Sequence, residues 1–304
     1  MNSISYIVPH YENVVGLEKL LASISLNSDD EIIVIDDKST VETINKIKEL
    51  KTKYDFQLIV NSTNKGAGYS RNIGIGLAQC EWVIFADSDD FFVKNYSERL
   101  LENLHLFYDI IYFSPVSIKQ STNKSVRSNR HEYFEFLIND YLTNKTTKKL
   151  NAIKYKFIVP WSKVFKREFL EKNTLYFDEI LVSNDVMFSV VSGYKASKVK
   201  VTNSVIYCCT ENDHSMTSQT SMAKTLDRID VLGKRNSYLR KRLTKKEYKE
   251  LDFIGFSFVL LSFRNKYSLS ERYNLVKHLK KNKVKIISVN YLLSTMLRLK
   301  RKRI

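Results

Sequence analysis

The sequence is poor in cysteine and has no apolar run long enough to cross a membrane. Its three cysteines are Cys80, Cys208 and Cys209, whose spacing fits neither a disulfide framework nor a zinc site, so we interpret them as buried thiols. The longest apolar run, 253–263, is too short to span a bilayer and predicts a buried helix. The N-terminal residues lack the basic and long apolar segments of a secretory signal, so we expect a soluble, cytoplasmic chain.

Two common phosphate-binding loops are also missing. No G-x-G-x-x-G follows the first expected strand, and no G-x-x-x-x-G-K-[ST] occurs, which excludes a dinucleotide fingerprint and a P-loop. One glycine-rich segment, GAGYSRNIGIG at 66–76, opens an expected helix, where such segments commonly bind phosphate. What remains is a ligand bound without those two loops, through carboxylates and a metal.

The chain is strongly basic, and the placement of the charge says more than its size. The sequence has 49 Lys or Arg against 33 Asp or Glu, a formal net charge of +16. Thirteen of these basic residues lie in 264–304 beside one acid, Glu271, so the rest of the chain is nearly balanced. Nucleic acid, a membrane or an anionic substrate would suit such a charge. No recognisable nucleic-acid module interleaves the basic residues with aromatics, so we expect no nucleic-acid partner.

Strand-like and helix-like segments alternate through the first third of the chain, which is typical of a parallel sheet with crossover helices. The expected strands cover 3–8, 31–35, 56–60, 82–86 and 109–113, and the expected helices 14–26, 41–53, 67–78 and 97–106. The less regular segment 116–222 is expected to add edge strands and loops. From 223 glycine and proline nearly vanish. We predict an α/β, Rossmann-like fold with a mainly parallel sheet over 1–222 and a basic helical region over 223–304.

Polar motifs follow four of the expected strands. They are PHYEN, DDKST, NSTNKGAGYSRN and DSDD. Ligands of such sheets bind beyond the carboxyl ends of the strands, so we expect these motifs to converge on one ligand site.

Three aspartates in the last of these motifs, Asp87, Asp89 and Asp90, need something that offsets their charge. Ionised carboxylates about 5 Å apart repel by roughly 3 kcal/mol per pair at an effective dielectric near 20. Water and salt offset this in a solvated turn, and a divalent cation offsets it by direct ligation. The convergence of four polar strand ends favours the ligand site. A nucleoside diphosphate-sugar fits it, with Asp37 and Tyr11 at the base or ribose and Arg71 at a base oxygen or phosphate.

Seven motifs together resemble those of the family 2 glycosyltransferases, which have the GT-A fold, and in particular bacterial capsule or lipopolysaccharide types. In order they are VPHYEN, VIDDKS, NKGAGYSRNIG, FADSDD, PWSKVFKREFL, NDVMFS and HSMTS, and the resemblance covers about 3–220. It implies an inverting, metal-dependent transfer of a hexosyl or N-acetylhexosaminyl group from a nucleotide-sugar, usually a UDP-sugar. The acceptor would be a hydroxyl of a glycan or lipid-linked saccharide in cell-surface polysaccharide synthesis.

The resemblance also implies roles for individual residues, with the donor side over about 1–115 and the acceptor side over about 116–222. The catalytic base is Asp185. Residues expected at the donor are Pro9, Tyr11, Asp37, Lys65, Gly66, Arg71, Asp87 and Ser88. Residues expected at Mn²⁺ or Mg²⁺ are Asp89, Asp90 and His214, of which His214 is equally compatible with an exposed loop. Residues expected on the acceptor side are Trp161, Lys163 and Asn184.

Two positions depart from the family's pattern. Asn184 stands where Glu is common before the base, which removes a nearby charge and bears on acceptor choice or on the pKa of Asp185. Lys38 stands where Gly is common after the paired aspartates, so the geometry of that turn stays open.

Several assignments have structural alternatives. Asp185 is also placed to cap the helix that follows it, and Trp161 and Lys163 also suit packing beneath a strand. Tyr11 is also placed to cover the core after Pro9. Arg71 lacks an easy alternative, because a cation at a helix start opposes the helix dipole unless an anion compensates it.

The C-terminal segment 286–304 combines an apolar helical face with five basic residues in 298–303. Such a helix binds an anionic membrane surface or packs on the catalytic domain, and both remain open. Two other function classes also remain: a metal-dependent nucleotidyltransferase, and a non-catalytic basic protein that binds nucleic acid or membrane. The sequence does not indicate an oligomeric state.

Overall fold

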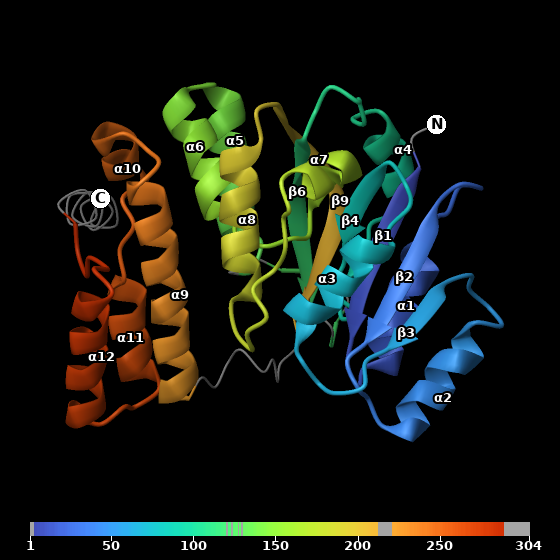
Figure 1. Ribbon diagram of the computed structural model, residues 1–304, viewed down its shortest axis with the longest axis horizontal. Coiled ribbons are helices and arrows are strands. Elements are labelled where there is room, and N and C mark those ends of the chain that lie inside the picture. The colour runs from blue at the N-terminus through green and yellow to red at the C-terminus, as the bar shows by residue number, and fades with distance from the viewer. Residues whose placement is uncertain are drawn as a thin grey trace. The chain divides into compact units, whose positions relative to one another are not determined.

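The computed structural model describes residues 3–119, 121–122, 124–126, 128, 130–211 and 221–288. It divides into two compact units, Met1–Asp213 and His214–Ile304, with the division nine residues before the boundary expected from composition. The first unit is a sheet with helices on both faces, and the second consists of helices (Figure 1).

The described strands of the first unit form one sheet in the order β3-β2-β1-β4-β8-β6-β9-β5, with β7 paired to β6. Their bounds are β1 Ile4–His10, β2 Glu31–Asp36, β3 Gln57–Val60, β4 Trp82–Phe85, β5 Phe91–Phe92, β6 Ile110–Lys119, β7 Lys124–Ser125, β8 Lys163–Lys166 and β9 Val199–Glu211. The strands β1 to β4 are parallel, as predicted. Antiparallel pairs enter with β8 and β5, whereas β6 and β9 are parallel to each other.

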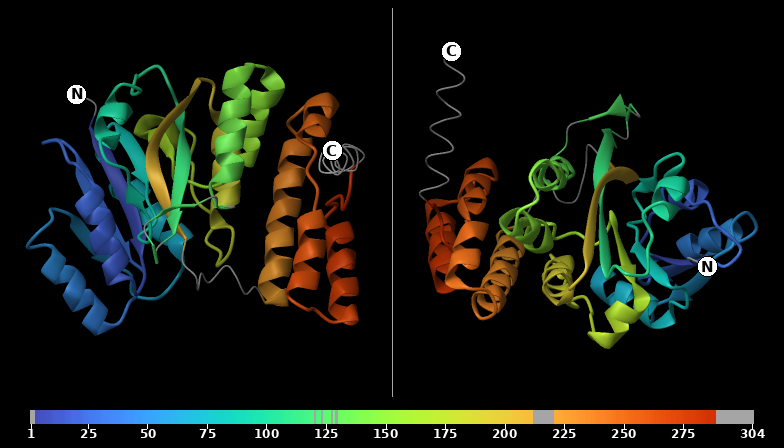
Figure 2. Two further views of the ribbon diagram at one scale, coloured as in Figure 1. Left: turned by 180° about the vertical axis from the view of Figure 1, so that it is seen from behind. Right: turned by 90° about the horizontal axis from the view of Figure 1, so that it is seen from above.

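Helices cover both faces of this sheet. Their bounds are α1 Val14–Ser23, α2 Val41–Leu50, α3 Ala67–Leu77, α4 Tyr96–Leu101, α5 Glu132–Thr143, α6 Thr147–Lys156, α7 Arg167–Lys172 and α8 Asn184–Lys195. The first two crossovers run in one direction along the sheet and the third returns, so right-handed connections put α3 on the face opposite α1 and α2. The views from the front and from behind agree with this (Figures 1 and 2).

Apolar runs explain the first half of the sheet. The strands β1, β2 and β4 are buried on both faces, since every one of their residues except the first of β2 is buried. Strands covered on both faces become continuous apolar runs, which is why their sequence pattern was readable. The helix α3 packs tightly on them at Gly74, where an added Cβ would lie 2.3 Å from Ile7 Cγ2.

The middle of the chain supplies interior strands, which corrects the expectation of edge strands. The strand β8 lies between β4 and β6, and β9 lies between β6 and β5. The physical reason is that Val164 and Phe165 of β8 are fully buried and pair with both neighbouring strands. The pair β5 with β9 was also unexpected, because a two-residue strand has no readable period.

The second unit is helical in its described part, with α9 Met222–Arg240, α10 Lys245–Leu251, α11 Phe256–Arg264 and α12 Leu269–Lys281. Capping boxes start α10 and α12. The helix expected within 253–263 is present as α11, but the expectation that it is buried is wrong, because Leu260 and Phe263 are more than half exposed. No helix in the described ranges has the length and hydropathy required to span a bilayer.

Two glycines of α3 give a matched test of this packing. We expect Gly74→Ala to destabilise the chain by about 1–3 kcal/mol, because its methyl group would overlap Ile7. The control Gly76→Ala meets nothing within 4 Å and should stabilise the chain by up to about 1 kcal/mol through helix propensity. Urea unfolding measures both variants, and equal effects of the two would contradict the packing described.

Candidate functional site

The predicted convergence of polar strand ends is confirmed by the sheet register. His10 at the end of β1 pairs with Asp36 of β2, and Asp36 pairs with Val60 of β3. The Ala86 amide after β4 donates to the Ile7 carbonyl of β1. The motifs that follow these strands therefore leave the sheet along the same edge.

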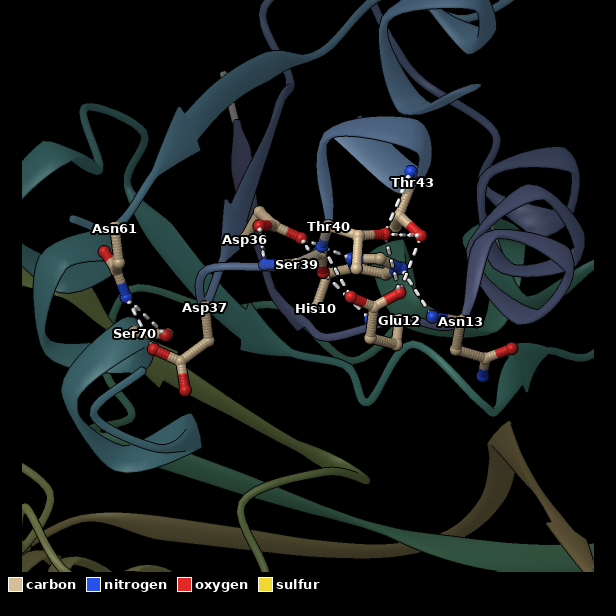
Figure 3. A network of polar contacts seen from close by, with 10 residues as sticks. All are labelled: His10, Glu12, Asn13, Asp36, Asp37, Ser39, Thr40, Thr43, Asn61 and Ser70. Carbon is tan, nitrogen blue, oxygen red and sulfur yellow. Dashed lines mark hydrogen bonds and ion pairs between the residues drawn. The ribbon is translucent and has the colours of Figure 1, made fainter. Parts of the chain in front are cut away.

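A buried network joins the first two motifs (Figure 3). His10 Nδ1 lies 2.8 Å from Asp36 Oδ2, and His10 Nε2 accepts the Asn13 amide at 3.1 Å. This pattern assigns the proton of a neutral ring to Nδ1. Burial acts to raise the pKa of Asp36, but hydrogen bonds from His10 and Ser39 outweigh it and hold that pKa below its usual value. His10 was not among the site residues expected from the sequence.

The backbone turns sharply after His10, at the end of β1, and leaves Tyr11 on the surface. Glu12 has a positive φ of 51°, and its carboxylate accepts hydrogen bonds from the Thr40 amide and the Thr43 hydroxyl at the start of α2. These bonds lower the pKa of Glu12. Tyr11 is 52 % exposed, so it does not cover the core, whereas Pro9 is buried within β1.

Asp37 organises the loop before α3. Its Oδ1 accepts from the Lys65 amide at 2.9 Å and from Asn61 Nδ2 at 2.9 Å, and its Oδ2 accepts from the Gly66 amide at 2.6 Å. Gly66 has a φ of 88° and a ψ of 164°, a conformation open to glycine alone. Asp37, Lys65 and Gly66, all expected at the donor, are therefore in one contact set. Lys38 adopts a φ of 68°, so the lysine takes up the left-handed conformation that glycine adopts more easily.

The three aspartates of the DSDD motif form a compact cluster. One carboxylate oxygen from each of Asp87, Asp89 and Asp90 lies within 4.8 Å of the others. Asp90 is fully buried, and it accepts from the Thr210 amide and from the Tyr207 hydroxyl of β9. The Tyr207 hydroxyl also accepts a hydrogen bond from the Asp87 amide at 2.9 Å, so this one side chain of β9 contacts both Asp87 and Asp90.

Two arginines approach this cluster from different elements. Arg71 of α3 donates to Asp87 Oδ1 at 2.6 Å and to Asn184 Oδ1 at 3.1 Å. Arg130, which precedes α5, lies 3.2 Å from Asp90 Oδ2 and 3.7 Å from Asp89 Oδ2. The anion that Arg71 required is therefore Asp87. Arg130 and Tyr207 escaped the sequence analysis, because nothing in their local sequence marks them as neighbours of the motif.

The aspartates differ in what they can still bind. Burial and the neighbouring charge of Asp87 raise the pKa of Asp89, and its side chain remains 38 % exposed. Burial raises the pKa of Asp90 well above its usual value, and both of its oxygens already accept protein hydrogen bonds. Asp89 is therefore the more available ligand, and the earlier assignment of Asp90 to the metal is less suited to its buried position.

Asp185 lies in the first turn of α8, and the alternative that it caps this helix is wrong. The N-cap residue is Ser183, with a φ of 57°, and Asn184 begins the helix. Burial raises the pKa of Asp185 to about 6, with a further increase from the charge of Asp87 and opposing effects from Arg71 and Lys163. Within the described residues no cation forms an ion pair with this carboxylate.

Glycine contacts hold the starts of α3 and α8 together. A Cβ on Gly68 would lie 2.3 Å from the Asp178 carbonyl and 3.0 Å from Asn184 Cβ. A Cβ on Gly16 of α1 would lie 2.5 Å from the carbonyl of Ser88. Ser88 belongs to the DSDD motif at 87–90, which we call the acidic turn. Close backbone approach at these two glycines brings α8 and α1 up to the sheet edge.

Trp161 and Lys163 are both buried in the core. The Trp161 ring stacks on Tyr207 with centroids 5.6 Å apart. Lys163 Nζ is fully buried and donates to the Phe157 carbonyl at 2.5 Å and to Ser189 Oγ at 3.2 Å. Burial lowers the pKa of Lys163 well below its usual value. His214 and the segment 289–304 lie outside the described residues.

The contacts of Asp37 lead to a test of the loop. Asp37→Asn would replace one of the two carboxylate oxygens, which together accept three hydrogen bonds, with an N–H₂ group that accepts none. Loss of these bonds costs about 1–3 kcal/mol locally. We expect the Lys65 and Gly66 amides to exchange about tenfold faster with deuterium. The control Asp55→Asn removes a charge from an exposed residue shortly before β3 and should change neither amide. Unchanged exchange in Asp37→Asn would show that Asp37 does not hold the loop.

Comparisons with known proteins agree with this geometry. Residues 5–174, more than half of the chain, match the family model described as Glycosyl transferase family 2. The chain is 28 % identical over 260 residues to a cholesterol galactosyltransferase of Borreliella burgdorferi, covering 80 % of this chain and 69 % of that protein. It is 26 % identical over 215 residues to the poly(ribitol-phosphate) beta-N-acetylglucosaminyltransferase TarS of Staphylococcus aureus, covering 68 % of this chain but 35 % of TarS.

Solved structures show the same fold. A crystal structure of S. aureus TarS in complex with UDP superposes with a TM-score of 0.67 at 19 % identity, covering 92 % of this chain and 80 % of that chain. A mannosyltransferase from Pyrobaculum calidifontis in complex with GDP-Man and Mn²⁺ superposes with a TM-score of 0.56 at 15 % identity, covering 97 % and 79 %. The first unit thus has the GT-A fold, and the chain belongs to glycosyl transferase family 2.

Proposed function

We propose that the chain transfers a sugar, with inversion, from a UDP-sugar to a hydroxyl of a glycan or lipid-linked saccharide in cell-surface polymer synthesis. The observation that carries this proposal is the bridge made by Arg71, which contacts both Asp87 in the acidic turn and Asn184 at the start of α8. A donor-side group and the residue next to Asp185 are thereby held by one buried guanidinium. The chain spans about a third of TarS and two thirds of the galactosyltransferase, whose named activities support this class of reaction.

The donor would lie along the sheet edge. The exposed Tyr11 ring is available to stack on the base. Asp37 accepts three hydrogen bonds within the protein and retains one lone pair, on Oδ2, for a base or ribose donor. Arg71, Asp87 and Ser88 would face the ribose and diphosphate. Pro9 in β1 and the Lys65 and Gly66 amides, which donate to Asp37, would fix the backbone next to the donor. TarS was solved with UDP, which supports a uridine nucleotide in this position.

The acidic cluster fits a hard divalent cation. Its donors are carboxylate oxygens, the ligand type that Mg²⁺ and Mn²⁺ prefer, and Asp89 presents them to solvent beside Asp87. When bound there, Mn²⁺ or Mg²⁺ would stabilise the negative charge that develops on the departing diphosphate. Asp90 would support the site from the core, and His214 stays an untested candidate ligand.

Asp185 is proposed as the base that receives the acceptor proton. In an inverting transfer the acceptor oxygen bonds to the anomeric carbon, the bond to the diphosphate breaks, and the hydroxyl proton moves to a carboxylate. A pKa of about 6 leaves Asp185 ionised at neutral pH yet more basic than an ordinary carboxylate. Asn184 positions this helix start through Arg71, while Trp161 and Lys163 support the acceptor side from within the core.

The family assignment disfavours the two rival classes, and no described feature supports a nucleotidyltransferase or a nucleic-acid-binding protein. A peripheral membrane role for 286–304 is a proposal that would suit a lipid-linked acceptor. Screening UDP-sugars and other nucleotide-sugars for UDP or nucleotide release in the presence of Mn²⁺ tests the function as a whole. Release of a nucleoside diphosphate from one donor supports it, and release of pyrophosphate from a nucleoside triphosphate contradicts it.

The metal assignment predicts the behaviour of Asp89. We expect Asp89→Ala to reduce Mn²⁺-dependent UDP release by at least about 100-fold, equivalent to about 2.7 kcal/mol, because the most available cation ligand is removed. Its melting temperature should stay unchanged, since the side chain is partly exposed. Asp55→Asn again serves as the charge control. Full activity of Asp89→Ala would remove this residue from the metal site.

The base assignment predicts a different pattern for Asp185→Asn. We expect its kcat to fall by about 10²–10⁴-fold while UDP affinity stays within about threefold, because proton acceptance is lost but the donor contacts remain. In the unaltered chain kcat/KM should fall tenfold per pH unit below about 6 and level off above it, since only ionised Asp185 accepts a proton. Glu179→Gln, in the exposed loop before α8, is the control. Unchanged kcat in Asp185→Asn would exclude it as the base.

A further inference from the structure

Arg130 places a second positive charge on the acidic turn, and it has no part in the sugar transfer proposed above. Its Nη2 lies 3.2 Å from Asp90 Oδ2, and its Nη1 lies 3.7 Å from Asp89 Oδ2. Nη1 also donates to the Thr210 carbonyl at 2.6 Å. The guanidinium therefore contacts the carboxylate that is proposed to hold the divalent cation.

The two arginines already offset most of the negative charge of the acidic turn, which weakens its attraction for a divalent cation. Three carboxylates face two arginines, since Arg71 contacts Asp87 and Arg130 contacts Asp89 and Asp90. With all five groups ionised the net charge is about −1, so a divalent cation alone would overcompensate it. A nucleoside diphosphate brings at least two further negative charges. Cation and diphosphate together therefore return the net charge to about −1, so the cation offsets the charge that the diphosphate brings.

We propose that Arg130 competes with the divalent cation for Asp89 in the donor-free chain and pairs with the diphosphate once cation and donor are both bound. This inference rests on the proposed function and adds a positioning residue to it. The Arg130 side chain is 33 % exposed, which leaves it room to change partners. A guanidinium also suits this exchange, because its planar donors match carboxylate and phosphate oxygens alike.

A purely structural role for Arg130 predicts the opposite sign. If Arg130 only held Asp90 and the Thr210 carbonyl in place, its removal would loosen the acidic turn and weaken cation binding. If it competes for Asp89, its removal strengthens cation binding. The affinity for Mn²⁺ in the absence of nucleotide therefore separates the two roles without reference to catalysis.

The experiment measures Mn²⁺ binding to the full chain by electron paramagnetic resonance, without nucleotide. We expect Arg130→Gln to bind Mn²⁺ at least about tenfold more tightly than the unaltered chain, equivalent to about 1.4 kcal/mol. Arg130→Lys keeps the charge and should stay within about threefold of the unaltered chain.

Arg167 provides a matched control. Its side chain is also 33 % exposed, pairs with the Glu171 carboxylate and donates to the Cys80 carbonyl. It follows β8, whose Lys166 pairs with Trp82 at the start of β4, so it lies at the other edge of the sheet. Arg167→Gln removes the same charge from an equivalent setting and should leave Mn²⁺ affinity unchanged.

The outcomes distinguish failure of the Arg130 proposal from failure of the proposed function on which it rests. Equal or weaker Mn²⁺ binding by folded Arg130→Gln overturns the competition while leaving the metal site intact. Failure of the unaltered chain to bind Mn²⁺, even with UDP present, instead removes the proposed metal site. If Arg130→Gln does not fold, a crystal structure of the unaltered chain with Mn²⁺ and UDP decides. Arg130 should then lie within about 3 Å of a phosphate oxygen, and a guanidinium still on Asp89 would overturn the proposal.

Discussion

The crowding of three carboxylates at the end of β4 is the constraint on which the site depends. Asp87, Asp89 and Asp90 approach one another within 4.8 Å, and such charges repel unless cations or hydrogen-bond donors offset them. The fold supplies part of the offset through Arg71 and Arg130, which come from opposite sides of the motif in the sequence. A divalent cation would offset the remaining negative charge, and a diphosphate would then bind to that cation. The proposed chemistry therefore follows from a charge that the protein leaves only partly neutralised.

The fold delivers these groups by bringing strand ends and helix starts to one edge of the sheet. Parallel register aligns His10 with Asp36 and thereby the first two motifs, and β9 reaches under the acidic turn through Tyr207. Glycine at position 68 allows α3 to touch the segment that leads to Asp185. The acidic turn and the start of α8 are thus parts of one packed core, which explains why a buried residue such as Lys163 influences the pKa of Asp185.

The sequence revealed the parts of this arrangement that depend on local pattern. The apolar strands β1 to β4 and the DSDD motif were readable because buried parallel strands and clustered charge leave clear signatures. The positions of Arg130 and Tyr207 were not, because they depend on β9 joining the sheet beside β6 and β5. For the same reason Asp89 and Asp90 looked equivalent in sequence, although one is partly exposed and the other is buried under β9.

The claim that a cation and a diphosphate together complete the acidic turn has a direct thermodynamic test. UDP is titrated calorimetrically into the unaltered chain, once with Mn²⁺ in excess and once with the metal chelated by EDTA. The account predicts that UDP binds at least about tenfold more tightly with Mn²⁺, because a diphosphate otherwise meets partly uncompensated carboxylates. Equal affinity for UDP under the two conditions would contradict it.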